Sequence, residues 1–144
     1  MNNLPRLAGW PERLADTIKA ASGRPFSWGT HDCALFAADC ALAITGIDPV
    51  RKSLGNYSSA LGATRALRRL GCADVGQLAD LVIGARVPIA RARRGDWVLA
   101  VEGRDDRAIV GLGVCVGVNS VVLAESGLTM RPTLGCAAAW MIGE

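Results

Sequence analysis

The sequence predicts a single α+β domain in which helices come first and an antiparallel sheet follows. The chain has 144 residues, which is enough for one hydrophobic core and too few for two. Apolar residues recur at helical spacing over about residues 10–84, and β-rich runs occupy about residues 95–142. The connections between these later runs are short, which favours antiparallel pairing. We therefore expect one domain over residues 1–144.

The first two helices have clear start and stop signals. Pro11 and Glu12 suit a first helical turn, because proline there loses no hydrogen bond and an acid faces the positive end of the helix dipole. The second helix begins near Asp32 and continues to Gly46. Its apolar residues lie nearly all round it, which is typical of a central buried helix. We expect this helix to pack on the C-terminal sheet.

Two more helices and several strands follow. Ser59 is a capping residue for a third helix that carries Leu61 and ends at Gly71, and Asp74 caps a shorter fourth helix. The period then changes from helical to extended. The runs expected as strands are residues 97–101, 109–116, 118–124 and 138–142.

Composition and charge exclude several classes of protein. With 51% hydrophobic and 20% charged residues, the chain is not disordered. Apolar stretches are interrupted before about 18 residues, so no membrane segment is expected. Residues 1–6 lack an apolar signal region, so we expect no secretory signal. The net charge is only +3, and the arginine run at residues 91–94 has no interleaved aromatics, so we expect a solvated loop there and no nucleic-acid partner.

The cysteines favour no disulfide framework and no cofactor. Five cysteines are an odd number in a chain without an export signal. None forms a C-x-x-C pair, so neither a zinc ribbon nor a thioredoxin-type site is indicated. Cys33 and Cys40 share a helix face, but their spacing is not specific for an iron–sulfur cluster held together with other cysteines. We expect no metal, and four of the five cysteines to be buried as small hydrophobes.

The residue with the greatest chemical potential is Cys33. It is predicted to lie in the first turn of a buried helix, where unpaired N–H groups and the helix dipole stabilise a thiolate and lower its pKa below about 8.5. The same N–H groups can form an oxyanion hole. Cys33 is therefore a candidate nucleophile. The alternative is a buried cysteine that lies near a helix cap by chance.

The stretch around Cys33 resembles a known family. Trp28-Gly29, then Asp32-Cys33 and an apolar helix start are similar to the nucleophile segment of the NlpC-type cysteine peptidases, which cut bacterial cell-wall peptides with a papain-like Cys–His pair. Residues 94–98 resemble the start of that family's first sheet strand, and residues 112–117 resemble the next strand. The resemblance spans about residues 23–124 and implies a papain-like NlpC-type fold.

A narrower resemblance concerns phage proteins. His31-Asp32-Cys33-x-x-Phe36, the Gly-Asp strand start and a Trp140 ending resemble phage and prophage proteins of unassigned activity that are encoded among tail genes. This resemblance implies other tail and hub proteins as partners in a hetero-oligomeric assembly. It also implies synthesis in a bacterial host cytoplasm and a final location in the virion tail.

The sequence departs from the active family at the catalytic base. In that family a histidine opens the strand that here ends at Gly117, and the corresponding position is Gly111. The chain's one histidine is His31, two residues before Cys33, where the two side chains would normally point apart. His31 is therefore either an alternative base, a loop residue that hydrogen-bonds the backbone near the helix start, or a metal or partner contact.

The neighbouring residues have simpler interpretations. Asp32 is expected to cap its helix, with support of the site as the alternative. Phe26 and Trp28 are expected to pack over the helix start, where aromatics beside a cleft can also bind a ligand. Asp96 is expected to fix the start of a strand.

Three functions remain open. The first is a structural phage tail component, associated with the tail tip or hub and built on a degenerate NlpC-type fold. The second is an active peptidoglycan hydrolase with Cys33 as nucleophile and a base from His31 or a partner chain. The third is a protein that binds host peptidoglycan without cutting it.

Overall fold

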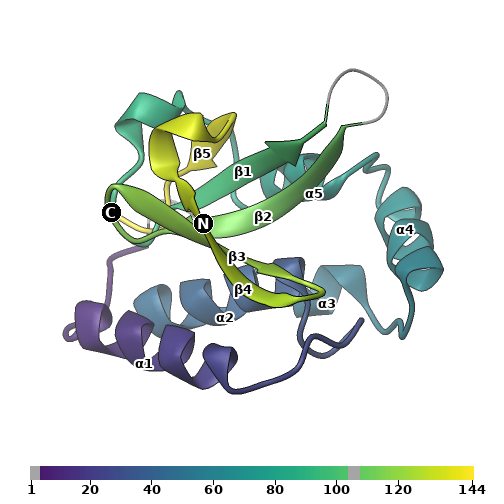
Figure 1. The fold of residues 1–144 in the computed structure, drawn as a ribbon, viewed down its shortest axis with the longest axis horizontal. Helices are drawn as coiled ribbons and strands as arrows, with labels where there is room; N and C mark the ends of the chain where they lie inside the picture. The colour runs from purple at the N-terminus through teal and green to yellow at the C-terminus, as the bar shows by residue number, and fades with distance from the viewer. Residues whose placement is uncertain (1–3, 104–107) are drawn as a thin grey trace.

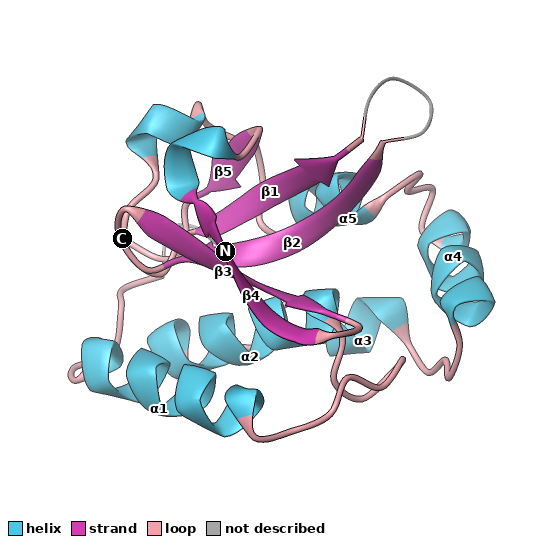
Figure 2. Cartoon of the chain, in the orientation of Figure 1, coloured by secondary structure: helices cyan, strands magenta, loops and turns pink. Residues whose placement is uncertain are grey.

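The computed structural model describes residues 4–103 and 108–144. Over these residues the chain forms five α-helices and then an antiparallel sheet of five strands in the order β4-β3-β2-β1-β5 (Figures 1 and 2). This arrangement confirms the predicted α+β class. The helices are α1 (Trp10–Ser22), α2 (Cys33–Thr45), α3 (Arg51–Leu54), α4 (Ala60–Arg69) and α5 (Val75–Val82). The strands are β1 (Trp97–Glu102), β2 (Ile109–Cys115), β3 (Asn119–Ala124), β4 (Gly127–Pro132) and β5 (Ala138–Trp140).

Helix α2 is the buried centre of the molecule, as its apolar composition predicts. Most of its 13 residues are buried, and it packs against α1 on one side and β2 on the other (Figure 1). Its start is fixed by Asp32, whose side chain accepts a hydrogen bond from the Leu35 N–H group. The indole N–H of Trp97 donates to the Ala37 carbonyl over 2.9 Å. This bond joins the first strand of the sheet to the helix.

The two faces of the sheet bury different clusters. One face contributes Trp97, Leu112 and Trp140 to the main core with the helices. The other face carries a smaller cluster that includes Val98 and Cys115 and is covered by residues 87–92. Those covering residues include the short 3₁₀ helix η1 (Ile89–Arg91), which packs against a second one, η3 (Thr133–Gly135). Around β5 the sheet is therefore covered on both faces (Figure 2).

A buried carboxylate at the start of β1 binds residues near both termini of the chain. Asp96 is 0% exposed and binds the guanidinium groups of Arg6 and Arg93, each over 3.0 Å. It also accepts the N–H of Ile142 over 2.9 Å. The prediction that Asp96 fixes a strand start is confirmed. The predicted solvated loop at residues 91–94 is wrong for Arg93, because its charge is paired with this buried acid.

One α-helix and one strand were not predicted, and one leucine that was expected on an apolar helix face is exposed. The edge strand β4 pairs with β3 through a two-residue turn at Glu125 and Ser126. Helix α3 lies within the polar connection that follows α2. Leu61 was expected on the apolar face of its helix, yet it is 59% exposed. None of the helices over the described residues is long and apolar enough to span a membrane.

Candidate functional site

The sheet opens between β2 and β3. Strand β2 pairs with β1 from Ile109 to Val114, but its pairs with β3 cover only Gly113 to Cys115. Strand β3 in turn pairs with β4 along its whole length, as far as Ala124. The first residues of β2 and the last residues of β3 therefore separate. This leaves backbone groups on both strands without a neighbouring strand on that side.

Cys33 lies at this opening. It is the first residue of α2, and the backbone N–H groups of Leu112, Ala34 and Cys33 itself lie close enough to its thiol to lower its pKa. The contact with Leu112 places the sulfur against the β2 backbone, immediately after Gly111. Cys33 is partly exposed, whereas the four other cysteines are buried, as predicted.

A cleft of about 480 Å³ extends from Cys33 along the opening. Phe26 and Trp28 form part of its wall and pack edge to face, with ring centroids 4.9 Å apart. Its charged lining consists of Glu102, Glu125 and Arg131. The predicted positions of both aromatic rings, beside Cys33 and a cleft, therefore agree with the structure. Glu125 and Arg131 carry no sequence motif and were missed.

Asp32 supports the start of α2 without any cation. It is 1% exposed, and it accepts hydrogen bonds from the N–H groups of Leu35 and Gly29 and from the hydroxyl of Tyr57. Burial is the largest cause that raises the pKa of Tyr57, and its hydrogen bond to Asp32 adds to the effect. Tyr57 is therefore a hydrogen-bond donor and not a base. Asp32 is the helix cap, as the sequence predicts.

Glycine is required where this loop passes Tyr57. Gly29 has a φ of +85°, and a Cβ there would lie 1.7 Å from the Tyr57 carbonyl oxygen. The Trp-Gly pair of the motif thus allows close approach of the loop before α2 to a segment that follows it by some 28 positions. Tyr57, the chain's one tyrosine, belongs to no motif that would have connected it to this loop.

His31 is directed toward α1. It is 1% exposed, and its Nε2 atom hydrogen-bonds the carbonyl oxygen of Ala21 over 3.2 Å. Its Nδ1 atom is buried and has no partner among the described residues. His31 does not line the cleft that holds Cys33. The structure thus shows a bond to the backbone, which was one of the three interpretations, but the partner lies at the end of α1 and not near the start of α2.

Two glycines of β2 differ in the space around them. A Cβ at Gly113 would lie 2.7 Å from the Val122 side chain and 2.8 Å from the Val121 carbonyl oxygen, so no side chain fits there. A Cβ at Gly111 would meet only Val122, at an ordinary 3.6 Å. Gly111 lines the cleft. Packing therefore does not require glycine at the position where the resemblance expects a histidine.

The thiol of Cys33 is not activated by its surroundings. Burial is the largest cause and raises its pKa to about 11, and the negative charge of Asp32 raises it further. The three nearby backbone N–H groups lower the pKa, but their effect is smaller than that of burial. The expectation that the helix terminus lowers this pKa is wrong, because desolvation disfavours the thiolate more than the N–H groups favour it. The thiol is protonated at neutral pH.

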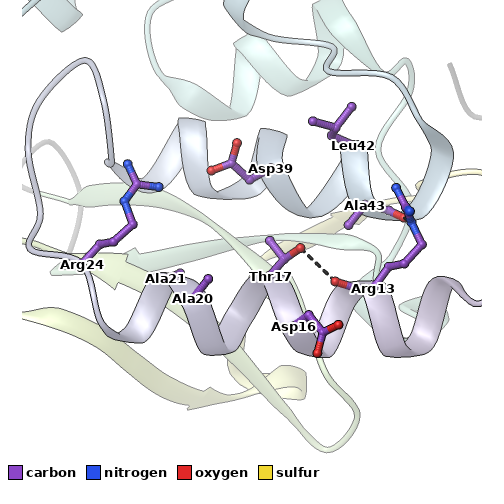
Figure 3. A pocket seen from close by; sticks show the side chains of 9 residues that line it. All are labelled: Arg13, Asp16, Thr17, Ala20, Ala21, Arg24, Asp39, Leu42 and Ala43. Atoms are coloured by element: carbon purple, nitrogen blue, oxygen red, sulfur yellow. Dashed lines mark hydrogen bonds between the residues drawn. The ribbon is translucent and has the colours of Figure 1, made fainter.

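A second groove, of about 460 Å³, lies between α1 and α2 (Figure 3). Charges of both signs line it, from Arg13, Asp16, Arg24 and Asp39, and the hydroxyl of Thr17 donates to the Arg13 carbonyl. No cysteine or histidine lines this groove. Over residues 4–103 and 108–144 there is also no group of three or more metal-ligating side chains. Of the predicted site residues, Cys33, Phe26 and Trp28 therefore meet at the Cys33 cleft, and His31 and Asp32 do not line it.

The fold and this cleft define a small α+β domain with a cysteine at the start of its buried helix, beside an opening in its sheet. A family model described as a domain of unknown function, DUF6950, matches residues 5–142. The match covers nearly the whole chain, so the protein belongs to the DUF6950 family. No curated protein and no solved structure matches the sequence significantly.

Proposed function

We propose that the protein is a non-catalytic component of a phage tail, associated with the tail tip or hub and built on a degenerate NlpC-type fold. The observation that carries the proposal is the absence of an imidazole beside Cys33. Gly111 stands where the base is expected, and His31 bonds a carbonyl of α1 instead. A thiol with a pKa of about 11 and no neighbouring base is a poor nucleophile at neutral pH.

The resemblance to proteins encoded among phage tail genes supports the tail assignment. The residues that carry this resemblance have packing roles here that do not depend on catalysis. Asp32 caps α2, Phe36 is fully buried, and Trp140 is fully buried in the core. A chain that has lost its base would keep these residues because the fold needs them. Other tail and hub proteins are the proposed partners.

The first experiment is the alkylation of Cys33 by iodoacetamide as a function of pH, read for each cysteine by mass spectrometry. We expect slow alkylation at neutral pH, with a midpoint near the value of about 11 that burial imposes. The denatured chain provides the reference rate for an ordinary thiol. Fast alkylation with an apparent pKa well below about 8.5 would overturn the proposal, because it would reveal an activated nucleophile.

The variant Gly111→His tests whether the cleft is a degenerate peptidase site. If position 111 is the site of the missing base, an imidazole there should lower the apparent pKa of Cys33, because an imidazolium near a thiolate stabilises it. Ile109→His is the matched control, since Ile109 lines the same cleft but is 72% exposed. An unchanged alkylation profile in folded Gly111→His would contradict the assignment of position 111 as the site of the missing base.

The tail assignment is tested on virions. Particles purified from the phage or prophage that encodes the chain should contain it, together with tail-tip and hub proteins, by mass spectrometry. Complete particles that lack the chain would contradict a role as a virion component. In that case the non-catalytic interpretation of the cleft would still be tested by the alkylation profile.

A second candidate is an active cell-wall cysteine hydrolase. The observation in its favour is the position of Cys33 at the start of α2, where backbone N–H groups near the thiol could form an oxyanion hole. A partner chain would have to supply the base. Release of soluble peptides from purified sacculi in the presence of tail proteins, lost in Cys33→Ala, would favour this candidate over the first.

A third candidate is peptidoglycan binding without cleavage, for which Phe26 and Trp28 provide an aromatic wall. Retention of the protein on sacculi without release of fragments would favour it. Loss of that retention in Trp28→Ala would locate the binding in the cleft.

A further inference from the structure

We propose that the cleft beside Cys33 binds an extended polypeptide segment that carries a cationic side chain and belongs to another protein. This inference rests on the proposed function, since it names the chemistry of the partner that a non-catalytic cleft would hold. Three features of the cleft support it: its unpaired strand edges, the small residues along it and its charge.

The strand edges favour a polypeptide. Residues 109–112 of β2 pair with β1, and residues 123–124 of β3 pair with β4, but these two segments do not pair with each other. Backbone N–H and C=O groups need partners when they are shielded from water. An extended segment that enters such a gap adds a strand and supplies those partners.

The small residues that line the Cys33 cleft leave room for the backbone of a bound segment. Gly111 has no side chain, and Ala100 and Ala124 are the small residues beside it in the cleft. A Cβ built at Gly111 touches only Val122 at 3.6 Å, so the space in front of this glycine is open. Phe26 and Trp28 form an apolar wall against which the side chains of a bound segment can pack.

The charge favours a cation on that segment. Of the charged residues in the cleft, Glu102 forms an ion pair with Arg131. Glu125 has no ion-pair partner within residues 4–103 and 108–144 and leaves the described lining with one uncompensated negative charge. This sign is opposite to the net charge of +3 on the whole chain. The cleft therefore discriminates in favour of lysine or arginine and against an acidic segment.

The test is an NMR titration of the 15N-labelled full chain with two end-capped peptides, Ala-Gly-Lys-Gly-Ala and Ala-Gly-Glu-Gly-Ala. We expect the lysine peptide to shift the amide signals of Leu112 and Ala124. We expect it to bind roughly three- to fivefold more tightly than the glutamate peptide, as an exposed charge pair allows. Glu125→Gln should remove this preference, and Glu12→Gln, an exposed change on α1, should leave it intact.

A blocking variant provides an independent measurement. Gly111→Val places a branched side chain in the open space and should abolish the shifts with the lysine peptide, with native near-UV circular dichroism as evidence of folding. Binding that survives in folded Gly111→Val would overturn the inference. Equal affinity for both peptides, or no shift at Leu112 and Ala124, would also overturn it.

Three outcomes bear differently on this inference and on the proposed function. Cleavage of the bound lysine peptide, detected by mass spectrometry after the titration, would uphold the binding site and overturn the non-catalytic role. Displacement of the lysine peptide by soluble cell-wall stem peptides at lower concentration would make the occupant host peptidoglycan and overturn the inference. Failure of both peptides to bind would leave the non-catalytic role standing.

Discussion

The two ends of the sheet are held together in opposite ways. Where β1 starts and β2 ends, Asp96 is fully buried between two arginines, and the sheet is covered on both faces. Where β2 starts and β3 ends, the strands separate and the Cys33 cleft occupies the opening. We call these the closed end and the open end. The proposed binding chemistry lies at the open end, because the facing backbone edges of β2 and β3 do not pair with each other there.

The same contrast holds for the two buried carboxylates. Asp96 at the closed end is paired with cations, whereas Asp32 near the open end is stabilised by two backbone N–H groups and the hydroxyl of Tyr57. An ion pair joins segments that are distant in sequence, such as Arg6 and Asp96. A helix cap acts locally and orients Cys33. Each carboxylate therefore suits the end at which it lies.

The largest expected effect is loss of the ion pairs at the closed end. Asp96→Ala should lower the free energy of unfolding by about 3–5 kcal/mol, because it leaves the buried guanidinium of Arg6 without its partner. Glu102→Ala at the open end breaks an exposed pair with Arg131 and should cost less than about 1 kcal/mol. Urea denaturation measures both values. Equal losses would remove the distinction between the two ends.

The second effect separates the two glycines of β2. Gly113→Ala should cost about 1–3 kcal/mol, because the added methyl group meets Val122 and the Val121 carbonyl at contacts below 3 Å. Gly111→Ala should change stability by no more than about 0.5–1 kcal/mol, the range typical of glycine against alanine in regular structure. Thermal unfolding of the two variants provides the comparison. A large loss in Gly111→Ala would show that the opening is packed.

The third effect is a dependence of stability on alkaline pH. The folded pKa of Cys33, about 11, lies above the value of 9.0 for a free thiol. The folded state therefore holds its proton over a range in which the unfolded state has lost it. Stability from this group is complete below about 8.5 and is lost as the pH rises toward 11, by about 2–3 kcal/mol, because each pKa unit corresponds to about 1.4 kcal/mol. The Cys33→Ala variant should show a shallower loss than the wild type in urea titrations across this range.

The smallest effect concerns the charge of Asp32. Asp32→Asn keeps a capping oxygen but removes the negative charge that raises the pKa of Cys33. The midpoint of Cys33 alkylation should then move to lower pH by a few tenths of a unit, as expected for a minor charge term beside a dominant burial term. Asp39→Asn, further along the same helix, is the control. A shift to higher pH would show that Asp32 acts mainly through the structure of the cap.

The helices were predictable because their end signals are local. Asp32, Ser59 and Asp74 are all N-caps in the structure, as expected from the sequence. Strand β4 was missed because its sequence, Gly-Leu-Thr-Met-Arg-Pro, has little β-branched character. Pairing with β3 stabilises it, and that pairing is a long-range property. The Ser126-Gly127 pair at its turn was the available signal.

The candidate site was predictable only where its residues are neighbours in sequence. Phe26, Trp28, Asp32 and Cys33 come from one short stretch and do lie together. Tyr57 reaches Asp32 from 25 residues away, and Glu125 reaches the cleft from the turn after β3. Neither has a motif that connects it to Cys33. The direction of the Cys33 pKa shift was predicted wrongly for the same reason, since the burial that sets it depends on contacts with β2.

By itself the sequence determined the α+β order, the helix caps, the buried centre at α2 and the glycine at position 111. These depend on spacing and on cap chemistry, which act within a few residues. Only the tertiary structure decided that β2 and β3 separate, that Cys33 is desolvated against the resulting edge and that His31 turns toward α1. Those outcomes depend on strand register and on burial between distant segments, and local sequence patterns do not encode either.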